Sequence, residues 1–241
     1  MKRITVILFF LMILAAAAGL SAAVNSQRPV SDPPDMDKIK QEVNDPSSKY
    51  YYPELFSRYQ QNETVMNLDD YRHLYLGALF QEDFDPYRHG ALDNKIEQLY
   101  YKEKHTRAEL DSIISFAEEA LTDDPFDLNQ INYLIFALRQ RGKTNRASIW
   151  QYRLNRLLEA ILSTGNGLSP ETSWIVIDPK HEYSLINFQK AVAEKSEFKQ
   201  PFYEYVSLRP DPNQPQGRPA GYYFNIRYLL EEYYRKHPEQ R

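Results

Sequence analysis

The sequence predicts an α+β fold in which helical hairpins come first and a small antiparallel sheet and a C-terminal helix follow. Two observations lead to this class. Apolar residues recur at intervals of three and four along much of residues 35–165, the spacing of amphipathic helices. After residue 165, short β-branched and aromatic runs are separated by turn residues, as in strands. Helices followed by strands, rather than alternating with them, favour α+β over α/β.

The first 23 residues have the pattern of a secretory signal peptide. Lys2 and Arg3 precede an apolar stretch, and Ser21-Ala22-Ala23 forms a small-residue cleavage site. The alternative is an uncleaved anchor, because residues 4–23 are about long enough to span a bilayer. The second half of this stretch is only weakly apolar, which favours cleavage. We therefore expect an exported protein, periplasmic or secreted, without a stable membrane anchor.

Residues 24–34 contain several prolines and no apolar periodicity, so we expect a flexible linker there. The remaining residues, 35–241, are expected to form one domain, with a helical part (35–165) and a β-rich part (166–241). Apolar spacing places the first four helices at residues 35–43, 53–59, 67–80 and 92–104.

Three further helices are expected between residues 106 and 162. Thr106 and Glu109 have the spacing of a capping box, in which the hydroxyl and the carboxylate each bind a free backbone amide. Asp124-Pro125 is expected to supply an N-cap with proline in the first turn of the second helix. Gly142 ends that helix, and the third begins near Thr144. The connections are short, so neighbouring helices should be antiparallel.

The β-rich part is expected to contain three strands, at residues 174–177, 202–208 and 222–226. Tyr203 and Tyr205 alternate along the second strand, which places both on one face. The proline-rich residues 209–221 are expected to form a long surface loop, and residues 228–235 the C-terminal helix. Apolar period alone leaves residues 181–188 open between strand and helix.

Composition excludes several classes of protein. The 241 residues include no cysteine, so there is neither a disulfide nor a thiolate zinc site. Removing Lys2 and Arg3 with the signal peptide leaves 27 basic against 33 acidic residues, a formal charge of −6. With no Lys/Arg-rich run, nucleic acid is not an expected partner. The 8 glycines form no phosphate-binding loop, and Gly165 and Gly167 fit a helix C-terminal turn better. We predict neither a cofactor nor a metal.

Two polar clusters allow either a chemical or a structural interpretation. His181-Glu182 beside Asp178 has the residue types of a metal site or an acid–base pair, and the alternative is a polar turn after a strand. The aspartates of segment 123–127 suggest calcium, but Pro125 interrupts the ligand spacing. Helix capping is therefore the better interpretation of these aspartates.

The 19 tyrosines are the most unusual feature of the composition. Tyrosine has an apolar ring and a polar tip, which suit core edges, protein interfaces and stacking on sugars. A core role is favoured over a binding surface, because large exposed aromatic patches are uncommon. Arg72 either pairs with a carboxylate or binds an anionic group. The candidate binding residues are Tyr71, Arg72, His73, Tyr75, Tyr100 and Tyr101.

Two resemblances add to this interpretation. The offsets of Ala120, Pro125, Leu134 and Ala147 resemble those of tetratricopeptide repeats over about one and a half repeats. The aromatic residue and glycine typical of the repeat's first helix are replaced by isoleucine, so we expect tetratricopeptide-like hairpins rather than a repeat array.

The second resemblance extends over nearly the whole mature chain. It rests on the runs Asp45-Pro46-Ser47-Ser48, Tyr50-Tyr51-Tyr52-Pro53, Tyr71-Arg72-His73-Leu74-Tyr75-Leu76-Gly77, Gly165-Asn166-Gly167, His181-Glu182-Tyr183 and Tyr223-Phe224-Asn225-Ile226. With these runs the chain resembles a family of exported domains of unknown function from gut-dwelling Bacteroidetes. This resemblance implies export from a Gram-negative cell and no particular activity.

The function predicted from these observations is non-enzymatic binding. The expected partner is a protein or peptide, held in the groove between the helices and the sheet. The alternatives are a carboxylate-based hydrolase, acting on a substrate such as a glycan, and a protein that binds glycans through its tyrosines without catalysis. 

Overall fold

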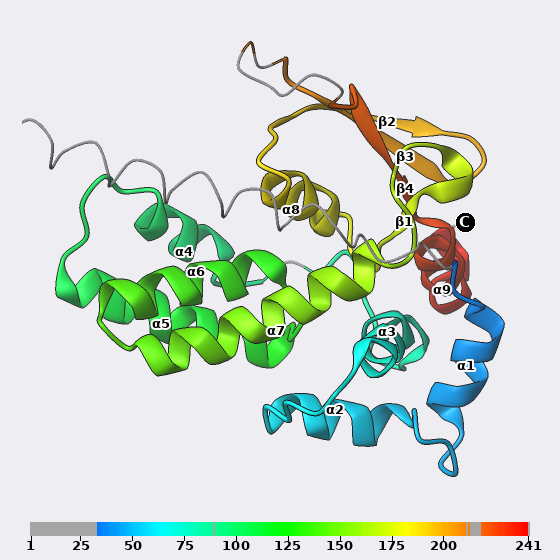
Figure 1. The fold of residues 1–241 in the computed structure, drawn as a ribbon, viewed down its shortest axis with the longest axis horizontal. Coiled ribbons are helices and arrows are strands. Elements are labelled where there is room, and N and C mark those ends of the chain that lie inside the picture. The colour runs from blue at the N-terminus through cyan, green and yellow to red at the C-terminus, as the bar shows by residue number, and fades with distance from the viewer. Residues whose placement is uncertain (1–32, 89, 211, 213–217, 241) are drawn as a thin grey trace, which may run out of the picture. The chain divides into compact units, whose positions relative to one another are not determined.

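The computed structural model describes residues 33–88, 90–210, 212 and 218–240. The predicted signal peptide and most of the predicted linker lie outside these residues. The α+β class is confirmed, because helices fill the first part of the described chain and a four-stranded sheet and a last helix follow (Figure 1). None of the helices described is long and apolar enough to cross a membrane.

Seven α-helices precede the sheet in the described chain. Their bounds are α1 Met36–Asn44, α2 Tyr52–Gln60, α3 Leu68–Gly77, α4 Asp93–Tyr100, α5 Arg107–Asp123, α6 Leu128–Gln140 and α7 Thr144–Leu162. A 3₁₀ turn, η1 (Ala78–Phe80), continues α3, which explains why the apolar pattern extends to residue 80.

Two helix starts test the capping predictions. The capping box at α5 is confirmed: the Thr106 hydroxyl accepts a bond from the Glu109 amide, and the Glu109 carboxylate accepts one from the Thr106 amide. The start predicted for α6 is wrong. Its N-cap is Asp127, whose Oδ1 accepts from the two amides that follow at 129 and 130. Asp124 bonds the amide of residue 126 instead, because Pro125 belongs to the connection and not to the helix.

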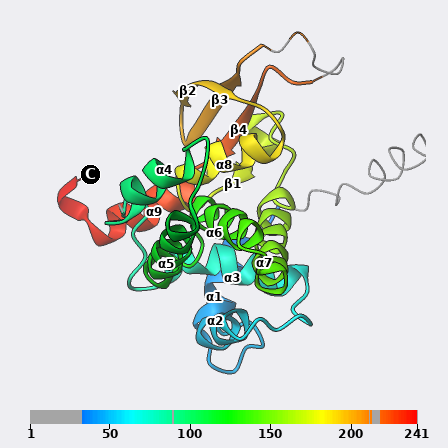
Figure 2. The ribbon, with the colours of Figure 1, turned by 90° about the vertical axis from the view of Figure 1, so that its left-hand side faces the viewer.

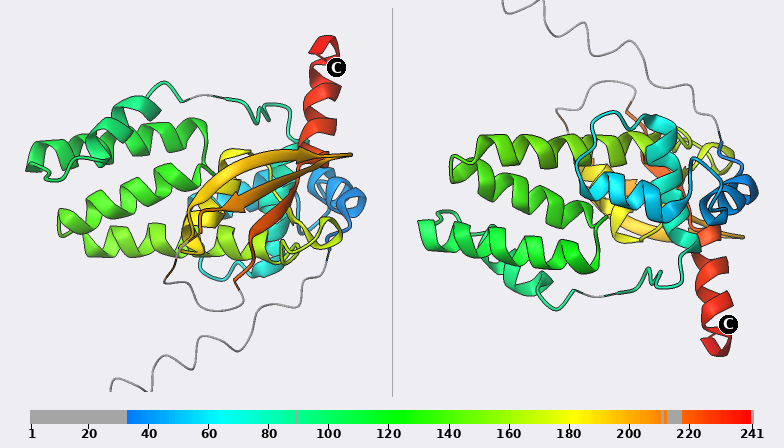
Figure 3. Two further views of the ribbon diagram at one scale, coloured as in Figure 1. Left: turned by 90° about the horizontal axis from the view of Figure 1, so that it is seen from above. Right: turned by 90° about the horizontal axis from the view of Figure 1, so that it is seen from below.

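The helices form a packed array. α5, α6 and α7 lie side by side as antiparallel hairpins, α4 lies against α5, and α3 packs on α7 (Figures 2 and 3). Their inward residues, such as Ile113, Leu134 and Leu157, are fully buried. This burial stabilises each helix far more than its intrinsic propensity does.

The sheet has the strand order β1-β4-β3-β2. Its strands are β1 Trp174–Ile175, β2 Ala193–Lys199, β3 Tyr203–Leu208 and β4 Gly221–Asn225. β3 and β4 are antiparallel as expected, and β2, which was not predicted, adds antiparallel to β3. β1 runs parallel to β4, so the sheet is mixed. β1 is also shorter than predicted, because the Ile177 amide donates to the hydroxyl of Tyr75 rather than to β4.

Two more helices complete the fold. The segment that apolar period left open is a helix, α8 (Lys180–Phe188), which contacts both α6 and β2. It therefore lies between the helical array and the sheet (Figure 1). The C-terminal helix, α9 (Arg227–Lys236), is joined to α1 by an ion pair of 2.6 Å between Lys40 and Glu232.

Candidate functional site

A hollow lies where three connections of the fold meet: the residues after η1, the α5–α6 connection and the β1–α8 connection. We call it the junction hollow. Its volume is about 90 Å³, and a second hollow of about 190 Å³ adjoins it and shares Arg88, Asp123 and Asp124 with it. The walls of the junction hollow include Tyr52, Asp83, Phe84, Asp85, Arg88, Asp123, Asp124, Phe126, Asp178 and His181.

A buried hydrogen-bond network fixes the floor of the junction hollow. His181 Nε2 lies 3.0 Å from the carbonyl of Phe126, which only accepts, so Nε2 carries the proton. Nδ1 then accepts from the hydroxyl of Tyr75 at 2.7 Å, and that hydroxyl accepts from the Ile177 amide at 3.2 Å. Burial lowers the pKa of His181, which agrees with a neutral ring. One tyrosine of α3 thus connects the α5–α6 and β1–α8 connections.

Replacing Tyr75 by phenylalanine should therefore destabilise the fold. The substitution leaves the buried Ile177 amide and His181 Nδ1 without their partner, and each buried unpaired polar group costs about 1–3 kcal/mol. We expect a loss of about 2 kcal/mol in the free energy of unfolding, measured by urea denaturation. The matched control is Tyr101→Phe, since the Tyr101 side chain is 72% exposed. Equal stability of the two variants would contradict the role given to the Tyr75 hydroxyl.

Two carboxyl groups of the junction hollow, Asp124 and Asp178, have a raised pKa. Burial raises the pKa of Asp178 to about 6, although the nearby Lys180 opposes the shift. Burial and the neighbouring Asp127 also raise the pKa of Asp124. Lys180 Nζ lies 3.6 Å from Asp127 and 3.8 Å from Asp178, so it offsets part of this negative charge.

The rim of the junction hollow carries more acidic than basic side chains. The guanidinium of Arg88 donates hydrogen bonds to the backbone carbonyls of Asp123 and Asp83, at 3.0 Å and 2.8 Å, and not to their carboxylates. In the part of the chain that the structure describes, no ion pair involves Asp83, Asp85, Asp123 or Asp124. A positively charged group at this rim would therefore meet carboxylates that are outside the ion pairs of the described residues.

The segment that carries Asp83, Asp85 and Arg88 is held from the side by α9. The ammonium of Lys236 donates to the carbonyls of residues 81, 82 and 84 and lies 5.2 Å from the ring of Phe84. The rings of Tyr87 and Tyr233 meet edge to face at 4.8 Å. The C-terminal helix thus fixes one wall of the junction hollow.

The six residues predicted as binding candidates do not form one surface. Tyr71 and Tyr75 are buried in the core, as the core interpretation expected. Tyr100 and Tyr101 pack with Tyr133 on the helical array. The helical face shared by Tyr71 and Tyr75 points inward because α3 packs between α2 and α7, which the sequence pattern does not reveal.

Arg72 and His73 lie apart from the junction hollow, beside α1. His73 stacks on Tyr50 with ring centroids 3.6 Å apart, and its Nε2 bonds the Glu42 carboxylate at 2.9 Å. Arg72 is half-buried and lines a separate hollow of about 330 Å³ together with His73 and Lys38. Only Tyr75, through its hydroxyl, reaches the site described here.

The two polar clusters that the sequence left open, around His181 and in segment 123–127, have different surroundings in the structure. Among the described residues, no group of three or more His, Asp or Glu side chains is placed to hold a metal. Asp127 caps α6, as the capping interpretation expected. His181 and Glu182 are consecutive on α8 and both buried, but they serve different environments: His181 bonds Tyr75, whereas Glu182 faces Glu204 of β3.

Glu182 and Glu204 form an acid pair between α8 and the sheet. Glu182 is fully buried, and neither of its carboxyl oxygens has a hydrogen-bond partner. Glu204 accepts a bond of 2.5 Å from the Ser196 hydroxyl. Burial and the repulsion from Glu204 raise the pKa of Glu182 to about 9, so Glu182 is protonated at neutral pH. The sequence singled out Glu182 but gave no indication of its partner, which lies on another element.

Comparison with known proteins gives one match. A sequence model of the domain of unknown function DUF4919 matches residues 37–235. The chain belongs to the DUF4919 family. None of the curated proteins and none of the solved structures matches it. The match covers every helix from α2 to α8 and all four strands, so the junction hollow lies within the DUF4919 domain.

Sequence reasoning missed the composition of this site. It weighed the aspartates of segment 123–127 and the cluster around Asp178 separately, and it did not consider Arg88. One signal in the sequence could have found the site, because each of the three connections contains an aspartate followed by a proline. These dipeptides are Asp85-Pro86, Asp124-Pro125 and Asp178-Pro179. Turns of this kind lie next to one another only when the packing of the helices brings the helix ends together.

Proposed function

We propose that this DUF4919 protein is an exported, non-enzymatic binding protein whose partner is a protein or peptide with a basic side chain. The observation that carries the proposal is the junction hollow, open to solvent, with aromatic walls and rim aspartates that form no ion pair in the described residues. Tyr52, Phe84 and Phe126 offer apolar surface to the stem of a lysine or arginine, and the rim aspartates attract its charged end.

Selection of random peptides displayed on phage tests this proposal, with the chain lacking its predicted signal peptide as the target. We expect enrichment of peptides that contain Lys or Arg. The double variant Asp83→Lys/Asp123→Lys should weaken binding of a selected peptide at least tenfold, because two exposed carboxylates of the rim become cations.

The matched control is Glu103→Lys, which adds a cation at an exposed position outside both hollows. It should leave the affinity for the selected peptide within twofold of that of the unmodified chain. Enrichment of peptides without basic residues, or equal affinity of the double variant and the unmodified chain, would refute the proposal.

A carboxylate-based hydrolase is the second candidate, favoured by the raised pKa of Asp178 in an open hollow. A carboxyl group with a pKa of about 6 is suited to donate a proton, and Asp124 lies in the same hollow. Hydrolysis of an oligosaccharide or peptide that disappears in Asp178→Asn would support this candidate over simple binding.

Three expectations from the sequence belong to the same proposal. Export through the N-terminal signal peptide, an origin in gut-dwelling Bacteroidetes and the tetratricopeptide-like character of α5 to α7 remain predictions. The antiparallel hairpins formed by these helices support the last of the three.

A further inference from the structure

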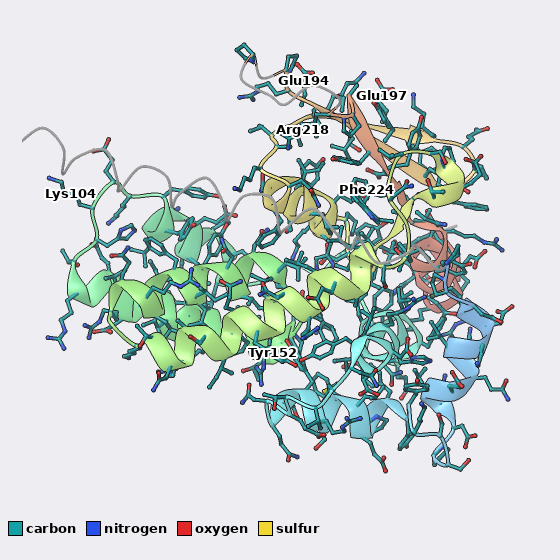
Figure 4. All side chains as sticks on the ribbon, viewed as in Figure 1. Lys104, Tyr152, Glu194, Glu197, Arg218 and Phe224 are labelled. Atoms are coloured by element: carbon teal, nitrogen blue, oxygen red, sulfur yellow. The ribbon has the colours of Figure 1, made fainter. Side chains whose placement is uncertain are left out.

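The register of the sheet sorts its side chains onto two faces. Residues paired directly across antiparallel strands share a face, so Val206 and Tyr222 lie together on one face, and Tyr205 and Tyr223 together on the other. Val206, Tyr222 and Phe224 are buried. Theirs is the inner face, and the face that carries Tyr205 is the outer face. Glu197, paired with Tyr205, belongs to the outer face, whereas Phe224 belongs to the inner face (Figure 4).

Three tyrosines are adjacent on the outer face. Tyr205 and Tyr223 are paired across β3 and β4, with ring centroids 4.7 Å apart, and Tyr203 is two residues along β3. Each side chain is half-buried and keeps part of its surface in solvent. We call these three residues the tyrosine platform. Seen from above, β2 and β3 lie over the other elements, and no described helix covers them (Figure 3).

Gly221 leaves room for the ring of Tyr205 beside β4, where that ring is tilted by 48° to the ring of Tyr223. A Cβ atom at this position would lie 2.5 Å from the ring of Tyr205 and 2.5 Å from the carbonyl of Val206. The ring of Tyr205 therefore lies against the backbone of β4, in space that only glycine leaves free. An aromatic ring laid along a sheet is a surface for stacking, whereas a ring directed away from the sheet is not.

The charges beside the tyrosine platform largely neutralise one another. The carboxylate of Glu197 bridges Lys195 and Lys199, with both distances 2.6 Å. Both lysines share the outer face with the tyrosines, since they pair with Ser207 and Tyr203. A polyanion such as nucleic acid requires several uncompensated cations, and this face has a net charge of about one. A neutral ligand rich in hydroxyl groups fits better: tyrosine rings stack on its C–H surfaces, and the flanking charged groups and tyrosine hydroxyls bind its hydroxyls.

We propose that the tyrosine platform is a second binding site, for a neutral oligosaccharide. It lies on the outer face of the sheet and does not depend on the function proposed for the junction hollow. The inner-face tyrosine, Tyr222, is buried against Trp174 and takes no part.

An array of neutral and sulfated oligosaccharides, probed with the chain lacking its predicted signal peptide, tests this site. We expect the chain to bind neutral oligosaccharides on the array. Titration calorimetry with the oligosaccharide that binds most tightly then measures the affinity. Tyr203→Val/Tyr223→Val should weaken this binding at least tenfold, because valine suits a strand but offers no ring. Tyr223→Phe keeps the ring and should stay within threefold of the unmodified chain.

Tyr101→Val is the matched control, since it removes an exposed tyrosine from the helical array. NMR on the unmodified chain does not depend on a variant that folds. The ring resonances of Tyr203, Tyr205 and Tyr223 should shift on titration with the oligosaccharide, and those of Tyr101 should not. Binding only to sulfated oligosaccharides, no binding to the array, or unchanged resonances of the tyrosine platform would each overturn the proposal.

Discussion

Glu182→Gln is expected to stabilise the protein by about 3 kcal/mol at pH 7. The pKa of Glu182 rises from 4.5 to about 9 on folding, through burial first and then through repulsion from Glu204, with a further contribution from Asp178. The unfolded chain ionises this residue freely at pH 7, and the folded chain does not. Glutamine is neutral in both states, so the substitution removes the ionisation that favours unfolding.

The sign of the pH dependence follows from the direction of this shift. A pKa raised on folding means that the folded state binds the proton more tightly. The contribution to stability is therefore complete below about pH 4.5 and is lost as the pH rises towards about 9. Within this window the free energy of unfolding should fall by about 1.4 kcal/mol per pH unit on account of this residue.

Urea denaturation at pH 5, 7 and 9 measures the effect. The difference between Glu182→Gln and the unmodified chain should be small at pH 5 and increase with pH. Glu194→Gln, an exposed substitution on β2, is the matched control and should not alter the pH dependence (Figure 4). A constant difference at the three pH values would contradict the assignment of a protonated Glu182.

Arg153→Ala should cost about 3 kcal/mol of the free energy of unfolding. Arg153 of α7 is buried, and its Nη2 donates to the carbonyls of Tyr59 and Gln60 at the end of α2, at 2.8 Å and 2.9 Å. The guanidinium also lies between the rings of Tyr59 and Trp150, at 4.7 Å and 4.5 Å. Truncation removes these contacts and leaves the last carbonyls of α2 without this donor.

Arg153→Lys should still cost about 2 kcal/mol, because an ammonium lacks the planar group that stacks between two rings. Burial lowers the pKa of Arg153, and no carboxylate pairs with it in the described residues, so charge alone does not account for its role. Arg139→Ala on α6 is the control, since Arg139 is exposed and its side chain donates to Gln151. Full stability of Arg153→Lys would show that the stacking is unimportant.

Local signals in the sequence predicted most of the helices, and the structure explains the exceptions. Capping residues and apolar spacing located the helices up to α7, with α4 ending earlier than expected, at Tyr100. β2 was not predicted, because its sequence AEKSEFK is charged and lacks apolar alternation. It is an edge strand, and its pairing with β3 rather than its own side chains makes it a strand.

The candidate sites show a similar division. The sequence placed Tyr203 and Tyr205 on one face of a strand, because side chains alternate with period two. It did not place Tyr223 beside them, since that neighbour depends on the register between β3 and β4. The junction hollow was harder still, because its walls come from connections that are far apart in the chain.

The sequence by itself determined the α+β class, the helices up to α7 and the absence of cysteine chemistry, because these depend on local spacing and composition. It also raised the question of whether the tyrosines seal a core or face a partner. Only the tertiary structure decided which tyrosines belong to the core and which are accessible to solvent. Tyr71 and Tyr75 are buried, and Tyr203, Tyr205 and Tyr223 reach the surface. The same holds for Glu182, whose raised pKa comes from burial and from Glu204, a residue on another element. Burial and the proximity of distant residues are properties of packing, and a single sequence encodes them only through the completed fold.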